Sequence, residues 1–256
     1  TDRPVLAGDL AATLAALADY LPRSASGELC KQLRERARRA GPILADEQQP
    51  IEFAVLAELE KRLPPASPVF VGNSLVVRDA DFCFSGDQRD IRLFGNRGTS
   101  GIDGNVSMAL GLAAASGQRA VGLLGDLALF HDSNGLLMSG HVAATLVVFA
   151  NGGGQIFRTL PQRELRDLER LWVCDTGLKI ADYCRLHGLH HARAETAGEF
   201  CAAFEASLGQ PNVSLIEIRV DPADSTAQRD ALSTALAKQK MRTLRSVARR
   251  SLRTDR

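Results

Sequence analysis

VGLLGDLALFHDSNGLLMSGHVAATLVVFANGGGQIF, residues 121–157, holds the pattern that decides the fold. An apolar run, Val121–Leu124, ends in Gly125-Asp126, and a second apolar run, Thr145–Phe149, is followed by Asn151. About one helix's worth of residues separates the two runs. This order of strand, loop, helix, strand and loop builds a parallel sheet. We therefore predict an α/β fold, a three-layer domain with a mostly parallel sheet.

The polar residues that follow the two apolar runs suggest a metal-bridged phosphate. Both loops fall at the carboxyl ends of neighbouring strands, where open α/β sheets bind ligands. Asp126 offers a carboxylate and Asn151 an amide oxygen, which are hard ligands suited to Mg²⁺. Glycines 152–154 would let the backbone approach a phosphate closely. The alternative is that Gly-Asp and Asn-Gly are ordinary turn dipeptides.

Composition excludes several classes of protein. The 256 residues carry a net charge of +1 and are 45% hydrophobic, which is typical of a globular chain with no bias toward polyanions. No apolar run approaches the roughly 20 residues of a membrane span. The five cysteines are scattered and have no metal-ligand spacing, so we expect reduced thiols and a cytoplasmic protein.

Glycine and proline residues, which interrupt helices and strands, indicate that the chain has three parts. We expect a leading segment at 1–50, a main domain at 51–222 and a basic helical or disordered tail at 223–256. The predicted elements of the main domain are helices at 51–63, 102–115, 178–186 and 197–208, and strands at 69–71, 91–94, 121–124, 145–149 and 213–220. A further helix is expected to begin at His131-Asp132, where Asp132 or Ser133 could cap it.

Several short sequence motifs, in the order in which they occur along the chain, resemble those of one family of enzymes. They are Gly72-Asn73-Ser74 with Arg78, Asn96-Arg97-Gly98-Thr99-Ser100-Gly101-Ile102-Asp103-Gly104, Gly125-Asp126-Leu127, and Asn151-Gly152-Gly153-Gly154-Gln155-Ile156-Phe157. A Gly-Asp followed after about 25 residues by Asn resembles the thiamine diphosphate enzymes. The other motifs resemble the MenD family, the 2-succinyl-5-enolpyruvyl-6-hydroxy-3-cyclohexene-1-carboxylate synthases of menaquinone and phylloquinone biosynthesis. The resemblance covers roughly residues 50–220.

The resemblance implies a fold and an activity. Residues 51–222 would be the diphosphate-binding (PP) domain at the C-terminal end of the enzyme, preceded by the tail of the middle domain. The enzyme decarboxylates 2-oxoglutarate and adds the succinyl carbanion equivalent to isochorismate. Its cofactors are thiamine diphosphate and Mg²⁺ (or Mn²⁺). The family also implies a homo-oligomer, a dimer or tetramer.

By the same resemblance, the metal is held by Asp126, the side chain of Asn151 and the carbonyl of Gly153. The cofactor residues it implies are Ser100, Gly101, Ile102, Gly125, Asp126, Leu127, Asn151, Gly153, Gly154, Ile156 and Phe157. The family usually has two or three asparagines before the glycines, whereas here a single Asn151 stands between Ala150 and Gly152. The alternative for Ile102 is helix packing, and for Ile156-Phe157 ordinary core.

Four residues are candidates for binding the substrates. Arg78 and Arg97 would bind their carboxylates, because guanidinium groups bind carboxylates bidentately. Ser74 could donate a hydrogen bond to the same acids, and Leu160 could make an apolar contact. Taken alone, each arginine could equally be a surface residue.

Other polar features carry no such prediction. His187, His190 and His191 are expected to be surface residues in a loop before a strand. From Lys238 to Arg256 there are eight Lys or Arg residues and one acidic residue, without interleaved aromatics. A solvated or disordered end explains this run, so we expect neither nucleic acid nor a membrane as a partner.

By the same resemblance, we expect the glutamate that activates the cofactor to lie outside this chain. In the family this residue comes from an N-terminal pyrimidine-binding domain, which nothing here resembles, and Glu52, Glu58 and Glu60 are expected to lie outside the site. We therefore expect no catalytic residue in this chain and no activity without that domain, in cis or in trans. The chain could be a fragment or a naturally split subunit. Two alternatives stay open: another thiamine diphosphate-dependent 2-oxoacid decarboxylase or carboligase, and a non-catalytic assembly partner.

Overall fold

The computed structural model describes residues 35, 49–84 and 91–254, with side chains as far as Lys238. Apart from Glu35, these residues belong to one compact unit that runs from Glu47 to Arg256. The predicted leading segment therefore falls almost entirely outside the described residues.

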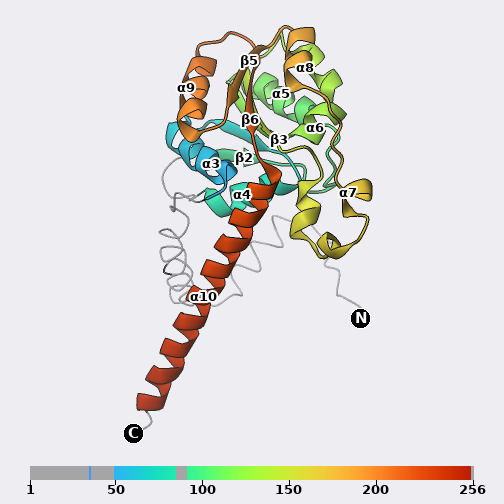
Figure 1. The fold of residues 1–256 in the computed structure, drawn as a ribbon. Coiled ribbons are helices and arrows are strands. Elements are labelled where there is room, and N and C mark those ends of the chain that lie inside the picture. Colours follow the sequence, from blue (N-terminus) through green and yellow to red (C-terminus); the bar gives the residue numbers. More distant parts are fainter. Residues whose placement is uncertain (1–34, 36–48, 85–90, 255–256) are drawn as a thin grey trace, which may run out of the picture. The chain divides into compact units, whose positions relative to one another are not determined.

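The unit is built on a six-stranded parallel sheet in the order β2-β1-β3-β4-β6-β5 (Figure 1). The strands are β1 (Pro68–Val71), β2 (Arg92–Phe94), β3 (Ala120–Gly125), β4 (Ala144–Ala150), β5 (His190–Ala194) and β6 (Ser214–Arg219). The α-helices are α3 (Ile51–Arg62), α4 (Leu75–Cys83), α5 (Asn105–Ser116), α6 (Asp126–His131), α7 (Leu168–Leu171), α8 (Ile180–Leu186), α9 (Ala197–Leu208) and α10 (Pro222–Thr254). Three short 3-10 helices are η1 (Ser133–Met138), η2 (Gln155–Thr159) and η3 (Pro161–Glu164).

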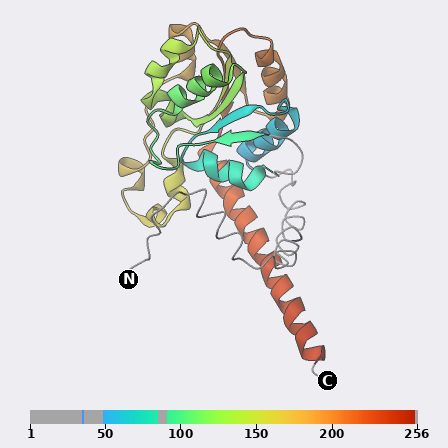
Figure 2. The same cartoon turned by 180° about the vertical axis from the view of Figure 1, so that it is seen from behind.

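Helices cover both faces of the sheet, which confirms the predicted three-layer α/β fold (Figures 1 and 2). One face packs against α3, α4 and α9, and the other against α5, α6, η1 and α8. The central strands β3 and β4 are apolar along nearly their whole length because side chains from both faces are buried.

The strand order reverses direction between β1 and β3. The chain runs from β1 outward to β2, then returns to place β3 on the other side of β1. At such a switch point the loops that leave the two strands diverge to opposite faces and open a crevice at their carboxyl ends. The loops after β1, β3 and β4 therefore surround the place where a ligand is expected.

Several elements differ from the sequence prediction. The predicted strands and the helices at 51–63, 178–186 and 197–208 are found with small shifts at their ends, but α4 and β5 were not predicted. In particular, His190 and His191 lie in the edge strand β5 and not in a loop, and Nε2 of His191 lies 3.1 Å from Oε2 of the buried Glu217. The polar sequence HHARA does not have the apolar character by which the central strands are recognised.

The segment after β3 also differs. In place of one helix that begins at His131-Asp132, the chain forms α6, which ends at His131, and the 3-10 helix η1, which begins at Ser133. Asp132 immediately precedes η1, but its side chain makes no capping hydrogen bond there. Its carboxylate accepts hydrogen bonds from the backbone N–H (2.6 Å) and hydroxyl (3.0 Å) of Ser107, in the first turn of α5. The helix expected at 102–115 thus begins at Asn105, and an internal carboxylate occupies part of its amino end.

Gly122 of β3 provides a test of how tightly the layers pack. A Cβ atom at this position would lie 2.8 Å from Cδ2 of Leu146 and 2.9 Å from Cβ of Ala109 on α5. We expect Gly122→Ala to lower the free energy of unfolding by about 1–3 kcal/mol through overpacking, measured by urea denaturation. Gly111→Ala, at an open position of α5, is the control and should raise it by about 0.5–1 kcal/mol. Equal effects of the two substitutions would contradict the packing described here.

Candidate functional site

Asp126 joins the two loops that the sequence singled out. Its Oδ2 accepts hydrogen bonds from the backbone N–H groups of Asn151 (3.0 Å), Gly152 (2.8 Å) and Gly153 (3.1 Å). Its Oδ1 accepts one from the N–H of Leu127 (2.8 Å). Burial raises the pKa of this carboxyl group, and the four backbone donors act against that rise. The carboxyl ends of β3 and β4 are therefore tied together by one buried side chain.

The glycines of this loop make close contacts within the protein. The N–H groups of residues 151–153 point at Asp126, so they are not free to meet a phosphate. Gly153 and Gly154 have positive φ angles of 76° and 65°. A Cβ on Gly153 would lie 2.5 Å from the carbonyl oxygen of Cys174, and one on Gly154 would lie 2.2 Å from that of Trp172. These two glycines are thus required by the close passage of the backbone at 172–174.

The oxygens of this loop fit a hard metal ion in chemical type. The Oδ1 of Asn151 accepts the N–H of Gly153 (3.2 Å), and the carbonyl of Gly153 accepts Nε2 of Gln155 (3.0 Å). Each of these oxygens, like Oδ1 of Asp126, has one hydrogen bond and a second lone pair that remains available. A carboxylate and two neutral oxygens make a donor set that suits Mg²⁺. No cluster of three or more His, Cys, Asp or Glu side chains suited to a metal occurs among the described residues.

A cavity of about 210 Å³ lies at the switch point beside Asp126. It brings together nine of the predicted site residues: Ser74, Ile102, Gly125, Asp126, Leu127, Asn151, Gly154, Ile156 and Phe157. They come from the loops after β1, β3 and β4 and from the segment before α5, which are far apart in the sequence. The ring of Phe157 packs against Trp172, with centroids 4.8 Å apart, so its position in the wall is fixed.

A second cavity, of about 480 Å³, shares Asp126, Leu127 and Asn151 with the first. Gly153 lines it together with the 174–181 segment. Three basic side chains, Lys179, Arg193 and Arg219, also line it, and sequence reasoning did not single them out. Two cavities thus meet at the Asp126–Asn151 pair, one with a largely apolar wall and one lined by basic and acidic side chains, among them Asp175 and Glu217.

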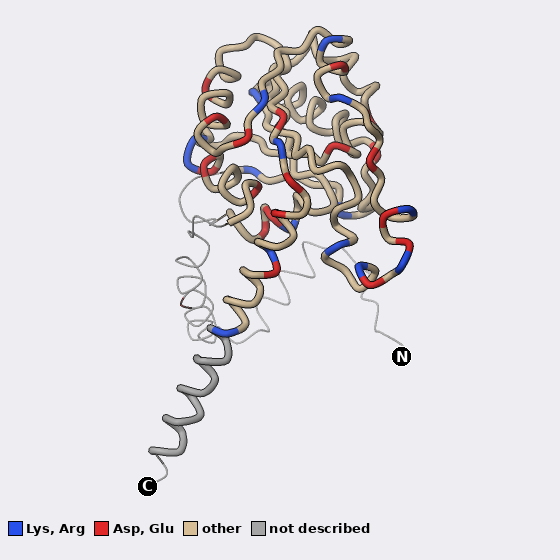
Figure 3. Tube along the Cα trace, viewed as in Figure 1, with Lys and Arg blue, Asp and Glu red and all other residues tan. Residues whose placement is uncertain are grey.

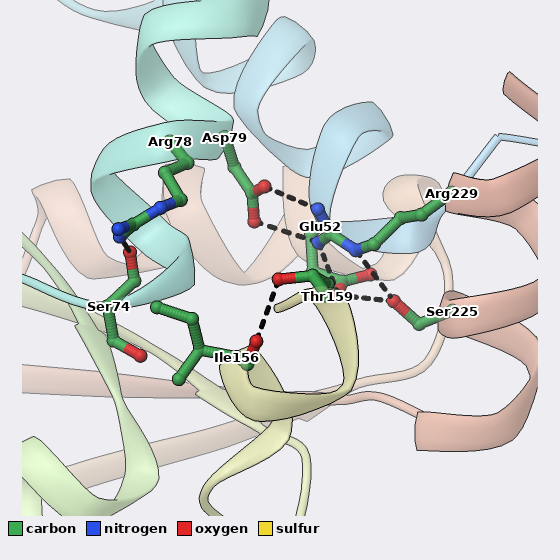
Figure 4. Close-up of polar contacts among 8 residues, drawn as sticks. All are labelled: Glu52, Ser74, Arg78, Asp79, Ile156, Thr159, Ser225 and Arg229. Atoms are coloured by element: carbon green, nitrogen blue, oxygen red, sulfur yellow. Dashed lines mark hydrogen bonds and ion pairs between the residues drawn. The ribbon is translucent and has the colours of Figure 1, made fainter. Parts of the chain in front are cut away.

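The two predicted substrate arginines lie near the first cavity but do not line it. Arg97 donates from Nη1 to Oδ1 of the buried Asn73 (2.6 Å), and Asn73 donates in turn to the carbonyl of Gly101. Arg78 is exposed on α4 and donates from Nη1 to the carbonyl of Ser74 (2.6 Å; Figure 4). Asn73 therefore links the loops after β1 and β2 to the start of α5. Ser74 itself has a φ angle of 74°, a strained conformation for a residue with a side chain.

Three other predicted site residues do not line either cavity. Ser100 is exposed and its hydroxyl donates to the carbonyl of Arg97 (3.4 Å). The carbonyl of Gly101 accepts the side-chain amides of Asn73 and Asn105, so its role is to hold the loop before Ile102. Leu160 is half-buried at the end of η2.

Sequence reasoning missed two acidic residues of the site. Glu52 was expected outside it, but it is buried and lines the 210 Å³ cavity, as does the buried Asp79 of α4. Both carboxylates contact Arg229 of α10 (Figure 4). Glu52 looks in the sequence like one more acidic residue in the first turn of a helix, and its partner is 177 residues away. No local pattern could have found it.

Charge and hydropathy outside the cavities agree with a globular domain. Figure 3 shows Lys and Arg interspersed with Asp and Glu along the described residues. Among those residues, no helix has the length and apolar character needed to cross a membrane.

A doubly wound, parallel α/β domain with a ligand site at its switch point is the class that fold and site define. A solved structure supports the fold: benzoylformate decarboxylase from Polynucleobacter necessarius matches with a TM-score of 0.59 and 21% identity, over 66% of this chain and 33% of that one. No protein-family model matches the sequence.

Curated relatives define the family more closely. Three proteins named 2-succinyl-5-enolpyruvyl-6-hydroxy-3-cyclohexene-1-carboxylate synthase match this chain. The one from Halobacterium salinarum is 38% identical over 91% of this chain and 41% of its own length. The one from Desulfitobacterium hafniense is 35% identical over 77% of this chain and 36% of its own length. The one from Bacillus pumilus is 38% identical over 69% of this chain and 31% of its own length. The chain belongs to this family, as the resemblance predicted, and spans about two fifths or less of the length of these relatives.

The role of Asp126 in the free chain can be tested by stability. We expect Asp126→Ala to lower the free energy of unfolding by about 2 kcal/mol, because three N–H groups of one loop lose their acceptor. The exposed Asp175, which accepts only the N–H of Gly177 (2.9 Å), is the matched control, and Asp175→Ala should change stability by less than about 0.5 kcal/mol. The free energies of unfolding of both variants can be measured by urea denaturation. Equal values for the two variants would refute the role of Asp126.

Proposed function

We propose that this chain is the C-terminal part of a thiamine diphosphate- and Mg²⁺-dependent synthase. The enzyme decarboxylates 2-oxoglutarate and adds the succinyl carbanion equivalent to isochorismate. Residues 51–222 form its diphosphate-binding domain, and an N-terminal pyrimidine-binding domain, in cis or in trans, completes the site. The observation that carries the proposal is the placement of Asp126 and Asn151 between two cavities at the switch point, in a chain whose relatives bear the name of this synthase.

The chain's own residues divide the work of binding. Asp126, Asn151 and the carbonyl of Gly153 hold Mg²⁺ and through it the diphosphate. The 480 Å³ cavity on this side is lined by Lys179, Arg193 and Arg219 and also by Asp175 and Glu217. Arg193 pairs with Glu195 and Arg219 lies 4.0 Å from Glu217, so this wall carries charges of both signs. Thiamine diphosphate supplies the electron sink for decarboxylation. Ile102, Ile156 and Phe157, which line the 210 Å³ cavity, would surround its reacting end.

The walls of the smaller cavity suit that chemistry. Ile102, Ile156 and Phe157 are apolar and exclude water from the reacting groups. Ser74, which lines this cavity, and Arg78 and Arg97, which lie near it, are the residues that we propose to bind the carboxylates of the two substrates. Each guanidinium uses one N–H group in the hydrogen bonds described above, and its other donors remain available for a carboxylate.

Cofactor binding provides the first test. We expect titration calorimetry to show that thiamine diphosphate binds this chain only with Mg²⁺ present. Asp126→Ala and Asn151→Ala should each abolish or strongly weaken binding, because each removes an oxygen ligand. Asp182→Ala, at an exposed position of α8 that lines neither cavity, is the control and should bind as the wild type does. Binding that is indifferent to Mg²⁺ or to Asp126 would contradict the proposal.

The products provide the second test. The chain should be combined with the N-terminal remainder of a relative such as the Halobacterium salinarum synthase, and given 2-oxoglutarate and isochorismate. We expect a coupled product from the mixture and none from the chain alone. Decarboxylation without coupling to isochorismate would instead indicate a related decarboxylase or carboligase. Cofactor binding without any turnover would indicate a non-catalytic partner.

The pH dependence of binding follows from the environment of Asp126. Burial raises the pKa of its carboxyl group, so this residue takes up a proton at a higher pH than an ordinary aspartate does. The protonated form is a poor metal ligand. Mg²⁺-dependent binding should therefore weaken as the pH falls through this raised pKa. Below that pKa, binding should release about one proton per site, as measured by calorimetry in buffers of different ionisation enthalpy. Affinity that stays constant down to the pKa of an exposed aspartate would contradict this.

A further inference from the structure

Arg229 of α10 is the centre of a buried polar cluster at the edge of the ligand cavity (Figure 4). Its Nη1 and Nη2 donate to the two carboxylate oxygens of Asp79 on α4, at 2.5 and 2.9 Å. Nη2 also donates to Oε1 of Glu52 on α3 (2.9 Å). Nε donates to the hydroxyl of Ser225 (3.2 Å), which donates to the same oxygen of Glu52 (2.7 Å). One guanidinium thus joins three helices.

The cluster is buried. The side chains of Glu52 and Asp79 are 3% and 5% exposed, and that of Arg229 is 14% exposed. The guanidinium also lies over the ring of Phe53, 4.9 Å from its centroid. Burial acts to lower the pKa of Arg229, but Asp79 and Glu52 outweigh it and raise that pKa. Burial, with a contribution from Glu52, raises the pKa of Asp79, since two carboxylates share one cation.

The cluster also forms part of the ligand site. Glu52 and Asp79 line the 210 Å³ cavity next to Asn73, Ser74 and Leu75. Glu52, Ser225 and Arg229 line a small void of about 10 Å³ together with Asn151 and Gln155. Oε2 of Glu52 is buried and has no hydrogen-bond partner within the described part of the chain. An unused acceptor at this place favours a ligand group that carries an O–H or N–H donor, because leaving a buried oxygen unpaired is costly.

We propose that Arg229 is a positioning residue of the ligand site: it holds Asp79 and Glu52, and with them α4 and α3, in the wall of the cavity. The inference rests on the proposed function. Asp79 stands one turn along α4 from Leu75 and is adjacent to Arg78, so its anchoring fixes where Ser74 and Arg78 lie. The first two turns of α10 then belong to the ligand site, although the sequence assigned them to a separate tail.

The charge of the cluster also orients the ligand. Two carboxylates against one guanidinium leave one excess negative charge at this end of the cavity. Anionic groups of a substrate are therefore disfavoured beside Glu52 and favoured toward Arg78 and Arg97. A hydroxyl group, as a neutral donor, is the matching partner for Oε2 of Glu52.

Two variants of Arg229 and one control test the inference on the full chain. Arg229→Gln removes the positive charge and the planar guanidinium that donates to two carboxylates. Arg229→Lys keeps the charge but lacks the guanidinium. Asp230→Asn is the matched control, because Asp230 is the next residue of α10 and makes only an exposed ion pair with Arg163 (3.7 Å). Hydrogen exchange of the ligand-free chain reports on α4 directly. We expect faster exchange over 75–83 in Arg229→Gln, little change in β3 and β4, and no change in Asp230→Asn.

Affinity separates positioning from mere stabilisation. At a temperature at which circular dichroism shows each chain folded, Arg229→Gln should bind thiamine diphosphate with Mg²⁺ roughly 10-fold or more weakly, and Arg229→Lys less severely so. Wild-type affinity in folded Arg229→Gln, or unchanged exchange over 75–83, would overturn the inference. If the wild type itself binds no cofactor, the proposed function fails, and the exchange measurement still decides whether Arg229 positions α4.

A third variant covers the case in which Arg229→Gln does not fold. The triple variant Glu52→Gln, Asp79→Asn, Arg229→Met removes all three charges together, which proteins tolerate better than a buried unpaired carboxylate. We expect this chain to fold and to show the same weakened binding and the same faster exchange over 75–83. Wild-type binding by the triple variant would show that the cluster only stabilises the fold.

Discussion

The carboxylate of Asp126 accepts hydrogen bonds from the N–H groups of three successive residues, 151–153, across the gap between two central strands. This contact fixes the loop after β4 against the start of α6, and both cavities of the site have walls on it. The parallel sheet makes the contact possible, since it delivers the carboxyl ends of β3 and β4 to one edge. The same carboxylate is the proposed metal ligand, so the loop is arranged around the charge before any ligand binds.

The surroundings of this contact are fixed by close approaches of the backbone. Because Gly153 and Gly154 have no side chains, the backbone at 172–174 can pass close to them, and it closes one side of the loop. Asn73 ties the loops after β1 and β2 to the segment that carries Ile102. On the far side, Arg229 joins α10 to α3 and α4. The site is thus assembled from segments far apart in the sequence, whose positions are set by buried polar contacts and by glycine.

The central part of the fold was predictable because its signals are local. The apolar runs of β3 and β4 and the Gly-Asp and Asn-Gly words that follow them lie within 37 residues, and their spacing indicates a parallel pair. The start of α6 at Asp126 was not predicted, because Gly125-Asp126 was assigned to a loop. In the structure β3 ends at Gly125 and the helix begins at the next residue. The strand β5 was missed because an edge strand with one exposed face can be polar.

The residues of the site that were predicted came from the family resemblance. The other residues of the site could not be predicted from the sequence. Nine of the expected residues meet in one cavity. Glu52, Asp79 and Arg229 are joined only by the tertiary fold, since Arg229 is 150 positions from Asp79 and 177 positions from Glu52 in the sequence. The glycines after Asn151 were expected to face a phosphate. The amides of Gly152 and Gly153 donate to Asp126, an arrangement that depends on backbone φ angles and that residue type alone does not reveal.

The central claim is that Asp126, Asn151 and Gly153 hold a divalent metal ion, and anomalous diffraction tests it most directly. Crystals of the chain grown with thiamine diphosphate and Mn²⁺ should show one strong anomalous peak about 2.0–2.2 Å from an oxygen of each of these three residues, in the range that oxygen ligands keep to small divalent cations. The peak should disappear in Asp126→Ala. A peak elsewhere, or cofactor density without metal between Asp126 and Asn151, would contradict the account.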